Sequence, residues 1–191
     1  MFTYSFRWDI IATNLPFLMS GLQTTLIVSA LTLVLAMMGG LVLASLDMSR
    51  YWPLRAIGIG FGEIVRNTPI LVQLLWAYYV LPIVFGINLS AFAALVIGLS
   101  IYSSAFIGEV YRAGIQAVPK GHREAAQVLG MTPFQSFRRI VLPQAVRMTL
   151  PPLAANFVQL IKYSSLGSVI SVAEITPVSY THLTLPTILL V

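Results

Sequence analysis

Two long stretches of the sequence, residues 22–46 and 67–108, contain no Asp, Glu, Lys, Arg or His. A helix that crosses a membrane needs about 20 predominantly apolar residues. The first stretch is long enough for one span, whereas the second is about twice too long for a single span and must turn back. Residues 86–90, Gly-Ile-Asn-Leu-Ser, are typical of that turn. The charge pattern therefore predicts an all-α fold, a multispan transmembrane helical bundle.

The overall composition supports membrane lipid as the surroundings of the chain. Only 9% of the 191 residues are charged and 58% are hydrophobic, against roughly 25% charged residues in soluble proteins. The net charge of +5 is typical of membrane proteins with basic cytoplasmic loops, and we do not expect a nucleic-acid partner. Without cysteine, and with His122 and His182 far apart in the sequence, we expect no metal site.

The hydrophobic segments predict four spans and their orientation. Residues 112–147 contain six of the eleven Lys and Arg residues, so the positive-inside rule places them in the cytoplasm. Because successive spans cross the membrane in opposite directions, the N-terminus and the turn at 86–90 are then outside, and the basic loop with Arg50 and Arg55 is inside. The four predicted spans are residues 22–46, residues 56–85 with a kink at Pro69, residues 89–108, and residues 148–173.

Residues 119–143 form the longest polar interruption and predict two short helices joined by a sharp turn. Pro119 opens the first helix, and Gly130 suits a left-handed turn after it. Thr132 with Gln135 three residues later is a capping box that starts the second helix. Ala125 and Ala126 give a small face that favours insertion into a protein groove. The alternative is a basic helix that lies on the anionic inner leaflet.

The sequence lacks a phosphate loop of the form G-x-x-x-x-G-K-[ST] and a paired nucleophile and base, so we expect no enzyme activity and no cofactor. Ionisable residues inside spans are costly and indicate a candidate solute path. Glu63 and Arg66 lie three residues apart and can pair on one helix face. Lys162, near Asn156 and Ser164, is a second candidate. A neutralised structural pair and a lysine that snorkels to the headgroups are the alternatives.

A short signature in the polar segment resembles a known family. Glu124-Ala125-Ala126, Gly130, Ile140 and Leu142-Pro143 match the EAA-x3-G-x9-I-x-LP pattern of permease subunits in binding-protein-dependent ABC importers. Residues 63–73 and 109–121 are similar to the branch that takes up polar amino acids such as histidine, glutamine and arginine. The resemblance runs from about Gly21 to about Thr176.

The resemblance implies a role for the segment and a set of partners. The family's coupling helix sits in a groove of a separate ABC ATPase subunit, which binds ATP and magnesium. Further implied partners are a second permease subunit, identical or not, and an extracytoplasmic solute-binding protein, and the implied location is the bacterial plasma (inner) membrane. The residues assigned to ATPase coupling are Gly121, Glu124, Ala125, Ala126, Gly130, Ile140, Leu142 and Pro143. The resemblance therefore favours a permease subunit of an amino acid importer. A membrane scaffold or regulatory subunit that binds a cytoplasmic partner, and a secondary transporter, are the alternatives.

The sequence departs from the family in two places. Where the family commonly has Lys-Asp-Thr-Ser-Leu, this chain has Lys162-Tyr163-Ser164-Ser165-Leu166, which disfavours a basic amino acid because Tyr163 cannot pair with a cation. The predicted solute path comprises Glu63, Arg66, Asn156, Lys162, Tyr163 and Ser164. Residues 1–176 are expected to form the transmembrane domain, with residues 112–147 as coupling loop. Residues 177–191 are unlike the family's fifth span, which implies a truncated or artefactually joined tail.

Overall fold

The computed structural model describes the backbone of residues 8–172 and the side chains of residues 14–172. Within these residues every regular element is helical, which confirms the predicted all-α fold. The helices are α1 (Trp8–Asp47), α2 (Trp52–Asn67), α3 (Ile70–Leu75), α4 (Leu81–Phe85), α5 (Ala91–Gln116), α6 (Lys120–Val128), α7 (Pro133–Ser136) and α8 (Leu142–Ser164). Single π-helical turns join α3 to α4 and α7 to α8, and a 3₁₀ segment, Ser165–Ile170, follows α8.

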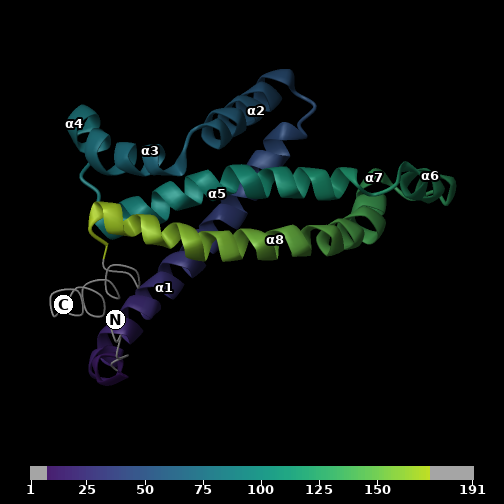
Figure 1. Ribbon diagram of the computed structural model, residues 1–191. Helices are drawn as coiled ribbons and strands as arrows, with labels where there is room; N and C mark the ends of the chain where they lie inside the picture. The colour runs from purple at the N-terminus through teal and green to yellow at the C-terminus, as the bar shows by residue number, and fades with distance from the viewer. Residues whose placement is uncertain (1–7, 173–191) are drawn as a thin grey trace, which may run out of the picture.

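The predicted first span, residues 22–46, lies within α1, which begins earlier, at Trp8. The 40 residues of α1 extend about 60 Å, and the helix crosses α5 and α8 obliquely (Figure 1). Small residues bring α1 close to α5. A Cβ atom built on Gly40 would lie 2.8 Å from Ile107 Cγ2 and 2.9 Å from the Gly108 nitrogen. The helix backbones therefore approach closely where Gly40 of α1 faces Gly108 of α5, beside Ile107.

The second predicted span, residues 56–85, is more sharply broken than the expected kink. The chain bends by 102° between α2 and the segment that begins with α3. Pro69 has no N–H to donate to the preceding turn, and side chains satisfy the carbonyls that it leaves. Thr68 Oγ1 donates to the Ile64 carbonyl at 2.8 Å, and Gln73 Nε2 donates to the Val65 carbonyl at 2.8 Å. The pair is therefore a broken span or a re-entrant loop rather than one kinked helix.

The predicted turn at residues 86–90 is confirmed. Gly86 adopts a left-handed conformation with φ of 67°, which glycine tolerates without steric cost. Ser90 then caps α5, since its hydroxyl accepts from the Ala93 N–H at 3.2 Å. Length and apolar composition qualify Asn14–Asp47 and Ala91–Gln116 as spans among the described residues, and the bent pair counts as a third if it is one span.

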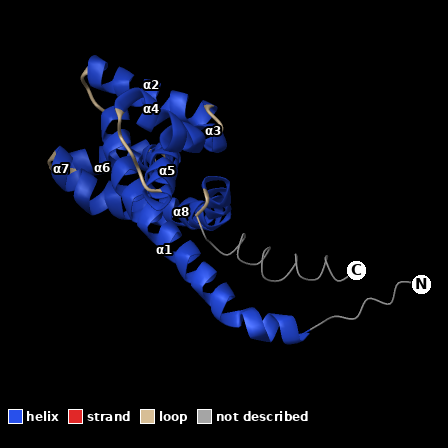
Figure 2. Ribbon diagram, turned by 90° about the vertical axis from the view of Figure 1, so that its left-hand side faces the viewer, coloured by secondary structure: helices blue, strands red, loops and turns tan. Residues whose placement is uncertain are grey.

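Helix α8 runs antiparallel beside α5 (Figure 1). The fourth span was predicted to start at Met148, but the helix already starts at Leu142 and is continuous with α7 through the π-helical turn Phe137–Val141. The 23 residues of α8 extend about 35 Å, enough to cross the apolar part of a bilayer. However, α8 is not among the described helices that qualify as spans by both length and apolar composition, so the fourth span stays a prediction. Figure 2 shows the bundle from one end, with α1 leaving it at an angle. The tail at 177–191 and a fifth span lie outside the described residues.

One cluster of buried apolar residues holds the helices together at the end of the bundle opposite α6. Val28 on α1 and Leu74 on α3 pack there with Leu95 and Leu99 on α5, and Ile170 of the 3₁₀ segment closes the cluster. All five side chains are fully buried. The other end of the bundle has only a small cluster, Val118, Val141 and Ala145. Polar side chains are thus concentrated at that second end.

Candidate functional site: a projecting helix and two pockets

Helices α6 and α7 project beyond the ends of α5 and α8 (Figure 1). Their local structure confirms the predicted turn. Pro119 directly precedes α6, and Gly130 has the left-handed φ of 73°. Thr132 Oγ1 accepts from the Gln135 N–H at 3.3 Å, while Gln135 Oε1 accepts from the Thr132 N–H at 3.0 Å. The left-handed Gly130 ends the chain's path along α6, and the capping box at Thr132 starts α7.

The residues predicted for ATPase coupling are mostly exposed on this projecting end. Ile140 is half-buried, and Ala126 is fully buried, so Ala126 packs inward. The predicted small outer face therefore consists of Ala125 and Gly121 rather than the two alanines. The exposed residues of the set are Gly121, Glu124, Ala125, Gly130, Leu142 and Pro143.

The sequence reasoning missed an apolar surface on the same two helices. Val128 is 88% exposed, Leu129 is 74% exposed and Phe134 is 70% exposed. Large apolar side chains grouped at a polar end of a molecule indicate an interaction site. The signal was present in the sequence, because Val128 and Leu129 end a polar helix and Phe134 follows the cap at Thr132.

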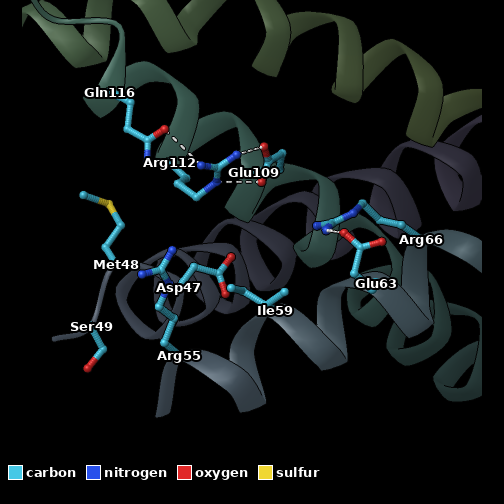
Figure 3. A pocket seen from close by; sticks show the side chains of 10 residues that line it. All are labelled: Asp47, Met48, Ser49, Arg55, Ile59, Glu63, Arg66, Glu109, Arg112 and Gln116. Carbon is cyan, nitrogen blue, oxygen red and sulfur yellow. Dashed lines mark hydrogen bonds and ion pairs between the residues drawn. The ribbon is translucent and has the colours of Figure 1, made fainter. Parts of the chain in front are cut away.

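A polar pocket of about 630 Å³ lies between the C-terminal end of α1, helix α2 and the C-terminal part of α5 (Figure 3). Its volume is in the range of small-molecule sites. Glu63 and Arg66 of the predicted solute path both line it. The full lining is Asp47, Met48, Ser49, Arg55, Ile59, Glu63, Arg66, Glu109, Arg112 and Gln116.

Glu63 and Arg66 form the predicted pair on one face of α2. Arg66 Nη2 donates to Glu63 Oε1 at 2.7 Å, and Asn67 Nδ2 donates to Glu63 Oε2 at 3.0 Å. Arg66 also reaches another helix, since its Nη1 donates to the Ala105 carbonyl on α5 at 3.1 Å. The pair therefore joins α2 to α5 and does not merely neutralise α2.

A second acid–base pair faces the pocket from α5. Arg112 Nε donates to Glu109 Oε2 at 2.9 Å, and its Nη2 donates to Glu109 Oε1. Arg112 Nη1 donates further to Gln116 Oε1 at 2.9 Å. Asp47 at the end of α1 completes the acidic lining, and no described residue donates to its buried Oδ1. Sequence reasoning did not place these residues in the path, although Glu109-x-x-Arg112 repeats the spacing of Glu63-x-x-Arg66.

A smaller pocket of about 120 Å³ lies between α5 and α8. The rings of Tyr102 and Tyr163 meet edge to face there, with centroids 5.6 Å apart. Asn156 lines the same pocket, and its Nδ2 donates to the Pro152 carbonyl at 2.9 Å. The pocket is lined by Tyr102, Ser103, Phe106, Asn156, Gln159, Leu160 and Tyr163. Its walls are aromatic and amide groups without a charge.

The predicted solute-path residues therefore do not form one site. Glu63 and Arg66 line the polar pocket, whereas Asn156 and Tyr163 line the aromatic one. Lys162 is exposed and lines neither pocket, and Ser164 is buried with its hydroxyl bonded to the Ile161 carbonyl at 2.8 Å. Among the residues from 14 to 172, no group of three His, Asp or Glu side chains lies close enough to hold a metal ion.

The known proteins to which this chain is similar are membrane components of transport systems. Residues 36–186 match the family described as the binding-protein-dependent transport system inner membrane component. The L-cystine transport system permease protein of Bacillus subtilis is 38% identical over 169 residues, which are 88% of this chain and 72% of that protein. The glutamine transport system permease protein of Escherichia coli is 36% identical over 172 residues, 90% of this chain and 78% of that protein.

Solved structures agree with these sequence relatives. The crystal structure of an amino acid ABC transporter with histidines has a TM-score of 0.89 to this chain at 36% identity, and the match covers 96% of this chain and 86% of that one. An inward-facing structure of the MetNI methionine ABC transporter has a TM-score of 0.66 at 18% identity, and the match covers 97% of this chain and 90% of that one. The second match shows the shared fold alone. The chain belongs to the family of inner membrane permease components of binding-protein-dependent ABC importers, in the branch of amino acid permeases.

Proposed function

We propose that this chain forms the translocation path for a polar amino acid and is driven by a separate ATPase subunit that binds helices α6 and α7. The observation that carries the proposal is the projection of α6 beyond the bundle, with Glu124, Ala125 and Gly130 exposed. The apolar side chains of Val128, Leu129 and Phe134 add area that a protein groove would bury. The sequence has no phosphate loop, so the energy for transport comes from a partner.

The proposed orientation places α6 and α7 in the cytoplasm and the N-terminus outside. Support comes from the basic residues, six of the eleven of which lie between residues 112 and 147. Figure 1 shows α1 and α5 running in the same direction, with α8 returning. With this orientation the polar pocket opens near the cytoplasmic ends of α1, α2 and α5, on the ATPase side.

The proposed assembly contains two permease subunits, ATPase subunits that bind ATP and magnesium, and an extracytoplasmic solute-binding protein. ATP binding in the partner brings the docking helices together and shifts the spans towards the state that accepts solute from outside, and hydrolysis resets them. A ligand can shift such an equilibrium only through its different affinities for the two states.

The solute path is proposed to include both pockets. The small pocket contributes Asn156 and Tyr163, and the polar pocket contributes Glu63 and Arg66. Lys162 and Ser164 lie beside Tyr163 on α8, and we retain both as path residues. Ser164 is already buried, whereas a second permease subunit would help to enclose the exposed Lys162. The uncharged lining of the small pocket favours an uncharged polar amino acid over a basic one.

Co-purification with the ATPase tests the docking assignment. Glu124→Lys and Gly130→Asp are expected to abolish ATPase association, because one reverses an exposed charge and the other adds a negative charge and a side chain to the exposed left-handed turn after α6. Arg50→Glu is the matched control, since it makes a charge change of the same size at an exposed residue in the α1–α2 loop. Normal association of both docking variants, with all three proteins inserted in the membrane, would refute the assignment.

The scaffold alternative predicts a different result in the same preparation. A scaffold would bind its cytoplasmic partner but would show no ATP turnover that depends on an external solute-binding protein. The relatives are transport permeases and do not favour it.

A further inference from the structure

Two side-chain hydrogen bonds tie the first turn of α6 to the long helices on either side of it. Arg123 Nη2 donates to the Ile115 carbonyl at the end of α5 at 2.9 Å. His122 Nδ1 and Gln144 Oε1, in the first turn of α8, share a hydrogen bond of 2.9 Å. His122, Arg123 and Gln144 flank the family signature, which ascribes no role to them.

The bond from Arg123 has a specific cause in the sequence. In a continuing helix the Ile115 carbonyl would accept from the N–H of residue 119, four positions later. Residue 119 is a proline, which has no N–H. The carbonyl is left without its helical donor at the negative end of α5, where a cation is favoured. The Arg123 guanidinium supplies both the missing donor and the positive charge.

The hydrogen bond from His122 ends at Gln144, on a part of α8 that cannot move independently of the bundle. Its neighbour Ala145 is 3% exposed and packs with Val118 and Val141. A Cβ atom on Gly114 of α5 would also collide with Thr149, one turn further along α8. A pull on Gln144 therefore acts on the packed pair of α5 and α8 rather than on a loose chain end.

The two halves of α6 consequently differ. The first turn, with His122 and Arg123, contacts the spans, whereas the end of the helix, with Val128 and Leu129, is exposed. Short turns lie on both sides of α6, at residues 117–119 and 129–132. The two side-chain bonds and the buried Ala126 therefore hold α6 against the bundle in addition to its backbone connections.

We propose that His122, Arg123 and Gln144 are positioning residues that transmit the displacement of α6 to α5 and α8. The inference rests on the proposed function, in which the exposed end of α6 binds the ATPase. Both pockets are lined by α5, and the small one also by α8. A movement that passes through Ile115 and Gln144 therefore reaches the helices that line the proposed solute path.

The experiment uses the assembled transporter, with ATPase and solute-binding protein, reconstituted in lipid vesicles. The test variants are Arg123→Ala, Gln144→Ala and the two combined. The control variants are Arg139→Ala and Gln127→Ala. The controls remove an exposed arginine at the same end and an exposed glutamine on the same helix. Two quantities are measured for each: the amount of ATPase that co-purifies, and the stimulation of ATP turnover by glutamine-loaded or cystine-loaded binding protein, whichever the wild type uses.

The expected result is a separation of the two quantities. ATPase co-purification stays within about twofold of the wild type, since the exposed end of α6 is untouched, while stimulation falls by about tenfold for Arg123→Ala, the scale of a lost charge-assisted hydrogen bond. Arg123→Lys is expected to recover part of the stimulation, because an ammonium can still donate to the Ile115 carbonyl. A double-mutant cycle with His122→Ala and Gln144→Ala adds a further test. Stimulation in the double variant is expected to be little lower than in Gln144→Ala alone, because the two side chains share one hydrogen bond.

Stimulation at the wild-type level in both Arg123→Ala and Gln144→Ala would overturn the proposal. Loss of co-purification in parallel with stimulation would also overturn it, because these residues would then shape the docking surface itself. If Arg123→Ala does not insert, Arg123→Lys and Gln144→Ala decide the question. Failure of the proposed function gives a different result, namely no ATPase association or no stimulation in the wild type.

Discussion

Arg66 on α2 donates from Nη1 to the backbone carbonyl of Ala105 on α5 at 3.1 Å, and from Nη2 to Glu63 on its own helix at 2.7 Å. The bond to Ala105 is a side-chain link between α2 and α5 beside the polar pocket. Because α2 ends one residue later, at Asn67, before a 102° bend, this link fixes the position of a helix whose continuation points in another direction. The Glu63–Arg66 pair is therefore both a pocket lining and a brace.

Arg66→Ala is expected to lower the stability of the permease by about 1 kcal/mol, at the low end for a hydrogen bond from a charged group because the side chain is partly exposed. Arg66→Lys should recover less than half of the loss, since one ammonium cannot reproduce the forked contact to Glu63 and Ala105. Thermal unfolding of the purified chain in detergent measures both. Unfolding temperatures equal to the wild type in both variants would show that the link contributes nothing.

Glu63→Gln is expected to change solute uptake while leaving ATPase association intact. The substitution keeps the shape and the hydrogen-bond acceptor for Arg66 but removes a charge from the polar pocket. Initial uptake rates into vesicles give the answer, with ATPase co-purification measured on the same samples. Unchanged uptake would leave the Glu63–Arg66 pair a structural brace only.

Gly40→Ala is expected to destabilise the contact between α1 and α5 by about 1–3 kcal/mol, the usual cost of an overpacked core. The new methyl group would lie 2.8 Å from Ile107 Cγ2 and 2.9 Å from the Gly108 nitrogen, and that backbone atom cannot move aside cheaply. Gly60→Ala is the matched control, because a Cβ there meets no heavy atom within 4 Å. Equal unfolding temperatures for the two variants in detergent would contradict the close α1–α5 packing.

Tyr163→Asp is expected to widen solute choice towards basic amino acids. The small pocket has no charge in its lining, so a cationic side chain would be desolvated there without a partner. A carboxylate in place of the phenol supplies that partner, whereas Tyr163→Phe supplies none and serves as control. Competition by arginine against the wild-type solute measures the effect. Strong competition already in the wild type would refute the assignment of this pocket to specificity.

Local sequence signals predicted local structure well. Thr132 and Gln135 form both bonds of the capping box, Gly130 and Gly86 adopt left-handed conformations, and Arg66 pairs with Glu63. In each case the residues that make the feature lie within four positions of one another. The chemistry of the segment alone determines such geometry.

Features that depend on residues far apart in the chain were missed. Pro69 predicts a kink, but not the 102° bend between α2 and α3, both of which contact α5. The bond from Arg66 to Ala105 and the gathering of Asp47 with Glu109 require that α1, α2 and α5 be placed first. Ala126 was assigned to the outer face because its small size fits a groove, and only the fold shows that it is buried.

We propose that this chain carries an amino acid across the membrane when a partner ATPase acts on α6. ATP-driven uptake into vesicles that contain the chain, its ATPase and its solute-binding protein is the most direct test. We expect uptake that requires all three components and is lost in Glu124→Lys, while Arg50→Glu transports normally. Uptake without the ATPase, or undiminished uptake in Glu124→Lys, would refute the proposed role of α6.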